Sequence, residues 1–340
     1  MSVYHDECAK MYAQKFAEQL KILPAFYSEM MQSISPDDMS LSTKVAYSRD
    51  VVRFFEYLKE SNPLYKDKEI KDFTLEDLEN VTPNDANEYV ATSLLPSVSS
   101  ATVSRYIAAC ASMYIELMRF EKLTRNPFLL VRRPKKRDSQ IIYLTESECD
   151  KLIMVIQSGQ GLTNKEALYH YPVRDIAMIS LILDTGIRVS EAVGLDIHQF
   201  DFEEHCAFVT RKGGHIDTVY FSDTVQDLLQ EYEEERKLRS DAVDNAFFLN
   251  RRNGHRVSVR SMELLVKRYA SIAIPTKAAK FSVHKLRSTF ATSYYAATHD
   301  LITLQEKMGH QNIATTKIYT AALKETSKNT RNFRQKRVTS

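Results

Sequence analysis

Apolar residues recur at the spacing of a helix along the first part of the chain. Between residues 8 and 32 they stand three or four positions apart, which places them on one helix face. The same spacing continues from Ser42, which is a suitable N-cap, through Leu58, and Pro63 follows soon after. Both segments are therefore predicted to be helices.

Three more helices are predicted before residue 127. Residues 74–77 have the order of a capping box and open a short helix. A second helix is expected over residues 83–94, because proline is favoured at the first position of a helix and Pro83 stands there. Ser99 or Ser100 caps a long helix that ends near Asn126, and its apolar face carries Val103, Ile107, Cys110, Tyr114 and Leu117. The pattern predicts an all-helical first domain of about 125 residues.

The second part of the chain combines helices with one hairpin. A capping box at residues 145–148 opens a helix, and the strongly apolar run 173–184 predicts a buried one. Two short segments, 206–211 and 216–221, are rich in valine, threonine and aromatic residues and flank Lys212-Gly213-Gly214-His215, which predicts a β-hairpin. Further helices are expected at 223–238, 259–273, 283–297, 300–309 and 313–326.

The chain has 340 residues, which is longer than one average domain. Its hydrophobic residues, 44% of the total, are enough for a sizeable core. We expect domains at 1–130 and 143–340, joined by a linker at 131–142. The linker is either a solvated connection or a segment that lies along a phosphate backbone and releases counterions there. Its cations are Arg132, Arg133, Lys135, Lys136 and Arg137.

Composition excludes several classes of protein. The net charge is only +2, so any nucleic-acid contact depends on how the charges are distributed. The four cysteines are scattered, which argues against a disulfide framework and against a zinc ribbon. The first residues lack the apolar core of a signal peptide, and no apolar run is long enough to span a membrane. We predict a cytoplasmic protein without a membrane partner.

Six residues of the second domain carry the candidate chemistry: Arg188, Lys212, His284, Arg287, His310 and Tyr319. Each has an ordinary structural explanation when taken singly. An arginine at the start of a helix usually caps that helix or interacts with solvent, and a lysine at the tip of a hairpin is usually a surface residue. Tyr319 is one of 18 tyrosines, so by itself it would be taken as a packing residue. His284 and Arg287 lie three residues apart on one helix face, where they either join the core or face a common anion.

Taken together, these residues are suited to phosphoryl transfer without a metal ion or another cofactor. Arginine binds phosphate oxygens with two parallel hydrogen bonds and stays charged, so it can neutralise a phosphorane. Tyrosine has a pKa of about 10, and a cationic pocket with a nearby histidine favours its phenolate. A lysine can protonate the leaving oxygen. No pair of acidic residues has the spacing of metal ligands.

The order and spacing of these motifs resemble the tyrosine recombinase (phage integrase) family, and most of all its Xer-type members and simple integrases of mobile elements. The matching segments are Thr185-Gly186-Ile187-Arg188-Val189-Ser190-Glu191, Arg211-Lys212-Gly213-Gly214, His284-Lys285-Leu286-Arg287 with the following Ser288 to Thr292, Met308-Gly309-His310, and Ile318-Tyr319-Thr320. Ser288 stands where many members have a second histidine, and Met308 where leucine is common.

The resemblance implies a role for each residue. Tyr319 attacks the scissile phosphate and forms a 3′-phosphotyrosyl bond, while Arg188 and Arg287 bind the non-bridging oxygens. Lys212 is the general acid toward the 5′-oxygen. His284 assists proton transfer at the nucleophile, and His310 forms a hydrogen bond to the phosphate. Glu191 supports the site.

The resemblance also implies a mainly α fold. An N-terminal helical core-binding (SAM-like) bundle precedes a mostly helical α+β catalytic domain with a small antiparallel sheet, and the two form a C-shaped clamp on DNA. The basic linker lies between them, so the resemblance favours its contact with DNA through Arg132, Arg133, Lys135, Lys136 and Arg137. The expected partner is a double-stranded recombination site, joined by a homotetramer through a Holliday junction. The task is chromosome dimer resolution or integration and excision of a mobile element.

Both ends of the chain have two interpretations. The first helix either packs between subunits or adds to the core. The segment after Tyr319 either docks onto a neighbouring subunit, as in the family, or is a basic end.

Three other functions are alternatives to recombination. A type IB topoisomerase shares the chemistry but relaxes supercoils without pairing sites. A catalytically inactive DNA-binding regulator has no need of Tyr319, and a helical scaffold needs none of the six residues. The motif spacing and the predicted first domain favour the recombinase.

Overall fold

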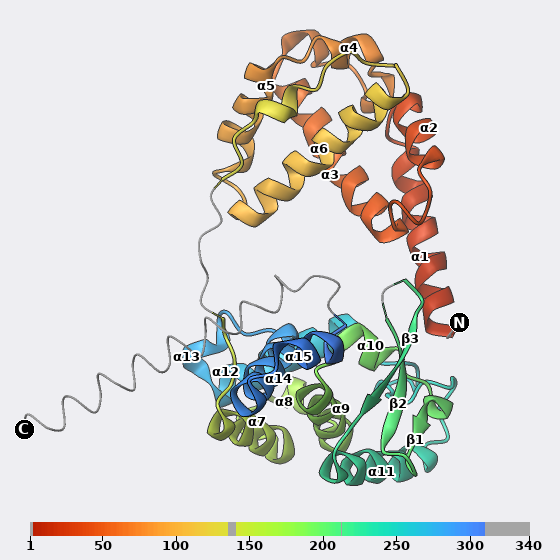
Figure 1. Ribbon diagram of the computed structural model, residues 1–340, viewed down its shortest axis with the longest axis vertical. Helices are drawn as coiled ribbons and strands as arrows, with labels where there is room; N and C mark the ends of the chain where they lie inside the picture. The colour runs from red at the N-terminus through yellow and green to blue at the C-terminus, as the bar shows by residue number, and fades with distance from the viewer. Residues whose placement is uncertain (1–2, 135–140, 212, 310–340) are drawn as a thin grey trace, which may run out of the picture. The chain divides into compact units, whose positions relative to one another are not determined.

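The chain divides into two compact units, Asp6–Asp138 and Ser139–Ser340, and the second also includes Met1–His5. The computed structural model describes the residues in three ranges, 3–134, 141–211 and 213–309 (Figure 1).

The first unit is helical throughout its described residues. Its helices are α1 (Val3–Leu20) from Asp6 onward, α2 (Ala25–Ser33), α3 (Leu41–Ser61), α4 (Leu75–Glu79), α5 (Pro83–Glu88) and α6 (Ser100–Arg119). Four shorter helical turns complete it: η1 (Pro63–Tyr65), η2 (Ile70–Asp72), the π-helical η3 (Tyr89–Leu94) and η4 (Pro127–Leu130).

Sequence and structure differ here at helix boundaries. The helix predicted over residues 8–32 is broken before Pro24, which has no backbone N–H to continue a helix and instead precedes α2. Ser40, and not Ser42, caps α3, and its hydroxyl accepts a hydrogen bond from the backbone N–H of Thr43. The capping box at residues 74–77 is confirmed.

The core of the first unit is aromatic. Helices α3 and α6 pack against each other and bury the rings of Tyr27, Phe54, Phe55, Tyr89 and Tyr114. The predicted long helix ends at Arg119, earlier than expected, because Glu121 takes a left-handed conformation with φ of 55°.

The second unit combines helices with a small antiparallel sheet. Its elements are α7 (Glu146–Ser158), α8 (Asn164–Ala167), α9 (Pro172–Thr185), α10 (Val189–Val193), η5 (Ile197–Gln199), β1 (Phe200–Asp201), β2 (Cys206–Thr210), β3 (Ile216–Tyr220), α11 (Asp223–Lys237), α12 (Val259–Ala273), α13 (Pro275–Ala278), α14 (Val283–Thr298) and α15 (Leu301–Lys307).

The sheet has the order β1-β2-β3, with Phe208 opposite Thr218 in the β2–β3 register. The predicted hairpin is thus confirmed. Strand β1 escapes prediction because two residues are too few to show an alternating pattern. The helix predicted at 313–326 lies outside the described residues.

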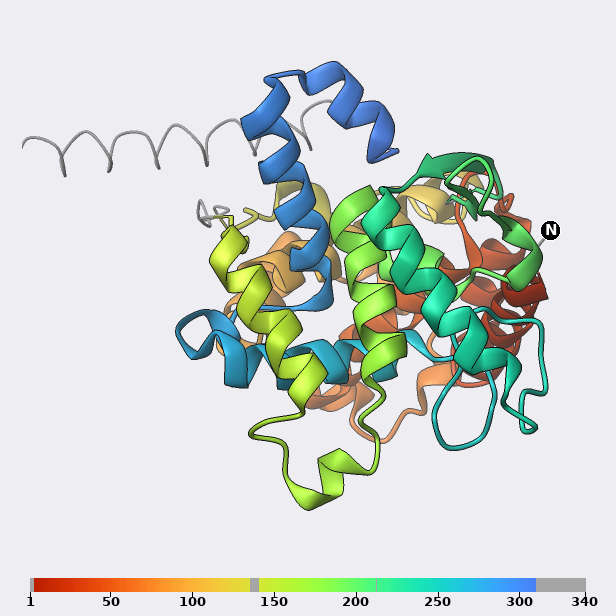
Figure 2. The same cartoon turned by 90° about the horizontal axis from the view of Figure 1, so that it is seen from below.

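Helix α9 lies at the centre of the second unit. Figure 2 shows it between α7 and α11, and α14 also packs against it. The helix is buried along most of its length, as its apolar sequence predicts. It ends at Gly186, whose left-handed φ of 67° turns the chain toward α10.

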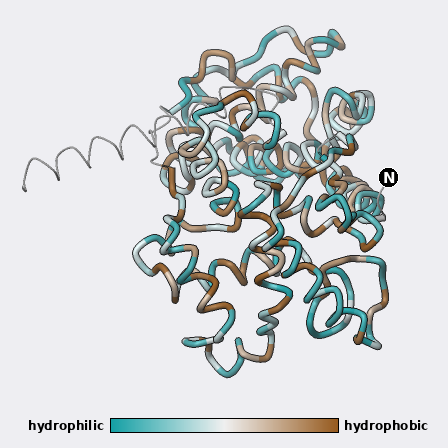
Figure 3. Tube along the Cα trace, turned by 60° about the horizontal axis from the view of Figure 1, so that its bottom comes forward, coloured by the Kyte–Doolittle hydropathy of each residue, from teal (hydrophilic) through white to brown (hydrophobic). Residues whose placement is uncertain are grey.

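Hydrophobic stretches alternate with hydrophilic ones along the helices of both units (Figure 3), which is the pattern of surface helices packed on a core. The predicted class, mainly helical with a small antiparallel sheet, is confirmed. Among the helices of the described ranges, none has the length and apolar character that crossing a membrane requires.

Candidate active site

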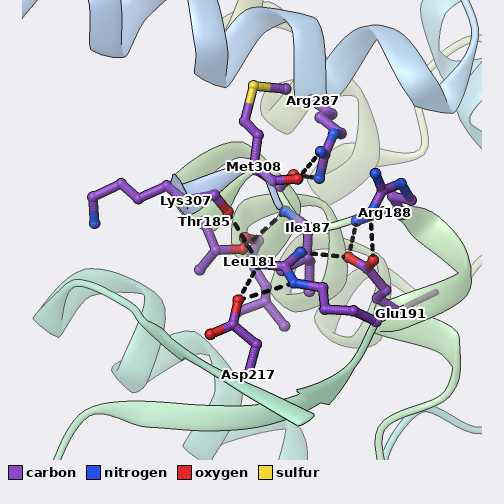
Figure 4. A network of polar contacts seen from close by, with 11 residues as sticks. Leu181, Thr185, Ile187, Arg188, Glu191, Asp217, Arg287, Lys307 and Met308 are labelled. Carbon is purple, nitrogen blue, oxygen red and sulfur yellow. Dashed lines mark hydrogen bonds and ion pairs between the residues drawn. The ribbon is translucent and has the colours of Figure 1, made fainter. Parts of the chain in front are cut away.

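The turn between α9 and α10 presents the first arginine. The hydroxyl of Thr185 donates to the carbonyl of Leu181 at 2.6 Å and fixes the helix end. Arg188 then takes the N-cap position of α10, and its backbone N–H donates to a Glu191 carboxylate oxygen at 2.8 Å. The Arg188 side chain donates to the other oxygen at 2.7 Å (Figure 4). Glu191 therefore fixes both the backbone and the guanidinium of Arg188.

Helix α14 supplies the second arginine. Arg287 is 1% exposed, and its guanidinium donates hydrogen bonds to the backbone carbonyls of Gly186 and Met308. These carbonyls belong to the turn after α9 and to the end of α15. One side chain thus connects three segments that are distant in the sequence.

His284 lies one turn before Arg287 on α14, and its side chain is partly covered while part of it stays exposed. Partial burial of its ring lowers the pKa of His284 below the usual 6.5, and the positive charges of Arg287, Lys285 and Arg188 lower it further. The imidazole is therefore neutral at pH 7 and can accept a proton.

A third arginine, which the sequence analysis missed, completes the network. Arg211 is 6% exposed, and its guanidinium donates to Glu191 at 2.9 Å, to Asp217 at 3.0 Å and to the carbonyl of Lys307 at 3.0 Å. The signal in the sequence was a cation directly before Lys212, at the end of a strand. Sequence alone gives no reason to expect its burial.

The structure does not describe every predicted residue. Lys212, His310, Tyr319, Lys135, Lys136 and Arg137 lie outside the described residues. Their described neighbours are Arg211, which precedes Lys212, and Gly309, which precedes His310. Arg132 and Arg133 are both exposed at the end of the first unit.

The structure brings Arg188, Arg287 and His284 together. Arg287 donates to the carbonyl of Gly186 in the turn before Arg188, and His284 lies one helical turn from Arg287 on α14. Two guanidinium groups with a neutral histidine can bind a phosphate and accept a proton beside it.

Comparison with known proteins identifies the family. The model of the phage integrase family matches residues 142–326, and that of the phage integrase N-terminal SAM-like domain matches residues 34–121. The chain belongs to the phage integrase family. Tyrosine recombinase XerS of Lactococcus lactis subsp. cremoris (strain MG1363) is 30% identical to this family member, over 92% of this chain and 96% of XerS.

Tyrosine recombinase XerC of Caldanaerobacter subterraneus subsp. tengcongensis is 31% identical, over 90% of this chain and 85% of the relative. This phage integrase family member is thus a tyrosine recombinase, an enzyme of site-specific recombination that breaks and rejoins DNA.

Solved structures share the fold. XerH site-specific recombinase bound to a palindromic difH substrate, in a post-cleavage complex, has a TM-score of 0.64 at 21% identity, with 89% of this chain and 86% of that chain covered. The Tn1549 transposon integrase in complex with transposon right end DNA has a TM-score of 0.64 at 18% identity, with 89% and 98% covered.

Proposed function

We propose that Tyr319 is the nucleophile of strand cleavage. Its phenolate oxygen attacks the scissile phosphorus, a P–O bond to tyrosine forms, and the bond to the 5′-oxygen breaks, which leaves a 3′-phosphotyrosyl adduct and a 5′-hydroxyl. Attack by the 5′-hydroxyl of another strand reverses the step and rejoins DNA. The adduct keeps the energy of the phosphodiester, so the cycle needs no ATP.

The phosphate would bind between Arg188 and Arg287, with its non-bridging oxygens toward the two guanidinium groups. The observation that carries this proposal is the hydrogen bond from the Arg287 guanidinium to the carbonyl of Gly186, which brings Arg287 to the turn that leads directly into Arg188. His284 would take the phenol proton of Tyr319, which requires the neutral imidazole that its lowered pKa supplies at pH 7.

Lys212 would protonate the 5′-oxygen as it leaves, and His310 would donate a hydrogen bond to the phosphate. Support comes from their described neighbours. Gly309 lies against Arg211, since a Cβ built on Gly309 would stand 3.3 Å from the Arg211 Nε. The segments that lead to Lys212 and to His310 therefore meet beside Glu191.

The proposed substrate is a double-stranded recombination site, bound in the cytoplasm. A homotetramer would join two sites through a Holliday junction, with the C-terminal segment of each subunit docked on a neighbour. The linker cations would contact phosphates: Arg132, Arg133, Lys135, Lys136 and Arg137. The biological task is chromosome dimer resolution or the movement of a mobile element. Solved relatives bound to difH and to transposon DNA support the substrate class.

A covalent-trapping experiment tests the nucleophile. A duplex that the protein binds is first selected from a randomised pool. Versions of this duplex are then made, each with one nick at a different position near the centre. Cleavage beside the nick releases a short fragment, which prevents rejoining and traps the adduct. The wild-type protein should yield a covalent protein–DNA adduct, and Tyr319→Phe should yield none. An adduct of unchanged yield in Tyr319→Phe would overturn the assignment. Tyr220→Phe is the control, because Tyr220 is an exposed tyrosine on β3.

A further inference from the structure

Arg211 connects three segments of the second unit through one buried guanidinium. Its Nη1 donates to Glu191 at 2.9 Å, and its Nη2 donates to the carbonyl of Lys307 at 3.0 Å. Its Nε and Nη2 both donate to one carboxylate oxygen of Asp217, at 3.1 and 3.0 Å. These acceptors belong to α10, to the end of α15 and to β3, so Arg211 fixes α15 against the other two.

The end of α15 is held by two arginines at successive carbonyls. Arg211 binds the carbonyl of Lys307. Arg287 binds the carbonyl of Met308 (Figure 4). The next residue is Gly309, with φ of 55°, and any side chain there would crowd the Arg211 guanidinium. The absence of a side chain at Gly309 thus leaves room for the Arg211 guanidinium, at the point where the chain continues toward His310 and Tyr319.

Arg188 does not depend on Arg211 for its own placement. Glu191 binds both the backbone and the side chain of Arg188 through contacts within three residues of sequence. Removing Arg211 leaves these two hydrogen bonds in place, whereas the carbonyl of Lys307 loses its donor. The effect of such a change should therefore fall on the end of α15 more than on the arginine site.

We propose that Arg211 is a positioning residue for the nucleophile: it holds the end of α15 on Glu191 and so directs the segment that carries Tyr319 toward the phosphate bound at Arg188 and Arg287. This inference rests on the proposed function of Tyr319. It assigns Arg211 no contact with the phosphate.

A change of nucleophile tests this role. In an otherwise wild-type protein, Arg211→Met should slow adduct formation by about a hundredfold, the loss typical of a misplaced reactive group. In the Tyr319→Phe background, hydrogen peroxide replaces the phenol: hydroperoxide attacks the phosphorus, the bond to the 5′-oxygen breaks, and that oxygen takes up a proton. Arg211→Met should slow this peroxide cleavage by no more than about twofold.

Arg236→Met is the matched control. Arg236 is 8% exposed on α11 and donates to the backbone carbonyls of Ala246 and Asp244, both at 2.9 Å. The Arg236→Met variant should lose stability as Arg211→Met does. Its rates of adduct formation and of peroxide cleavage, each per folded molecule, should stay unchanged. Arg211→Lys, which keeps the charge but not the fork, should show the same selective loss to a smaller extent and serves if the methionine variant does not fold.

Two results would overturn the inference: an equal loss with tyrosine and with peroxide, which indicates support of the phosphate site or of the fold, or no loss with tyrosine. Failure of the proposed function looks different, because then the wild-type protein forms no adduct or Tyr319→Phe forms one at the same yield.

Discussion

Glu191 accepts a hydrogen bond from Arg211 at 2.9 Å, and both side chains are buried. The same carboxylate also binds the Arg188 guanidinium at 2.7 Å through its other oxygen. One negative charge thus lies between two positive ones, and its position decides where both arginines point.

Glu191→Gln should therefore destabilise the protein. An amide offers one oxygen in place of two and turns its NH₂ toward a guanidinium, so a buried cation loses its partner. Breaking a buried ion pair in this way typically costs about 3–5 kcal/mol of the free energy of unfolding. Urea unfolding measures the loss, and Glu204→Gln, at an exposed carboxylate, should be nearly neutral. A neutral result at Glu191 would show that the network contributes nothing to stability.

His284 should titrate below the ordinary histidine range in the free protein. Partial burial of the ring lowers its pKa first, and the charges of Arg287, Lys285 and Arg188 lower it further, so the midpoint of its titration should fall below the usual 6.5. Lys285→Gln removes one of these charges and should raise the pKa of His284. An NMR titration, with the resonance assigned through His284→Gln, measures both values.

Cleavage that uses neutral His284 as the proton acceptor should fall as the pH drops through this lowered pKa, and the fall in kcat/KM should move to higher pH in Lys285→Gln. The sign follows from the neutral imidazole being the reactive form. If the acid limb of the pH profile of kcat/KM stays at the same pH in Lys285→Gln, His284 is not the proton acceptor.

Gly186→Ala should damage both the fold and the site. The left-handed φ of 67° is strained for any residue with a Cβ, and that Cβ would lie 2.2 Å from the Cδ1 of Phe290. The cost should exceed the roughly 1 kcal/mol of backbone strain alone, since Phe290 must move as well. Thermal unfolding measures it. Gly186→Ala with Phe290→Ala should behave differently from the sum of the single variants, because the clash is then relieved.

Periodicity and capping residues predicted most of the second unit's helices, because an apolar stripe and a capping oxygen are local properties. The buried run 173–184 became α9 (Pro172–Thr185), and the box at residues 145–148 opened α7 as expected. The start of α3 was predicted wrongly, because the pattern indicated Ser42 as the cap and the structure uses Ser40, two residues earlier. Either serine can cap, and packing decides between them.

The site was predictable as a set of residues but not as a set of contacts. Spacing on one helix face placed His284 beside Arg287, yet Arg287 binds Gly186, which is 101 residues away in the sequence. Arg211 was missed for the same reason: its burial depends on Glu191 and on the carbonyl of Lys307, which only the folded chain brings to it. Arginine is mostly exposed in proteins, so nothing in the residue type itself indicates burial at this position.

The linker cations should affect DNA binding through salt. Arg132 and Arg133 are both exposed, and each phosphate that they neutralise should release counterions. Arg132→Ala with Arg133→Ala should therefore reduce the slope of log K against log salt by about 0.9 for each phosphate that is no longer neutralised. Lys237→Ala is the control, because that exposed lysine pairs with Glu233 and Glu234 on acidic α11. An unchanged slope would mean that the two arginines do not bind phosphates.

Lys212→Ala should slow cleavage, because the 5′-oxygen then leaves without a proton from the proposed general acid. A substrate with sulfur in place of the bridging 5′-oxygen should restore the rate, since a thiolate leaves unprotonated. Arg188→Lys should not be restored, because its loss concerns the non-bridging oxygens. Single-turnover cleavage of nicked duplexes with either bridging atom measures all four combinations. If sulfur restored neither variant, proton donation by Lys212 would be ruled out, and the lysine would have to act on the phosphate charge.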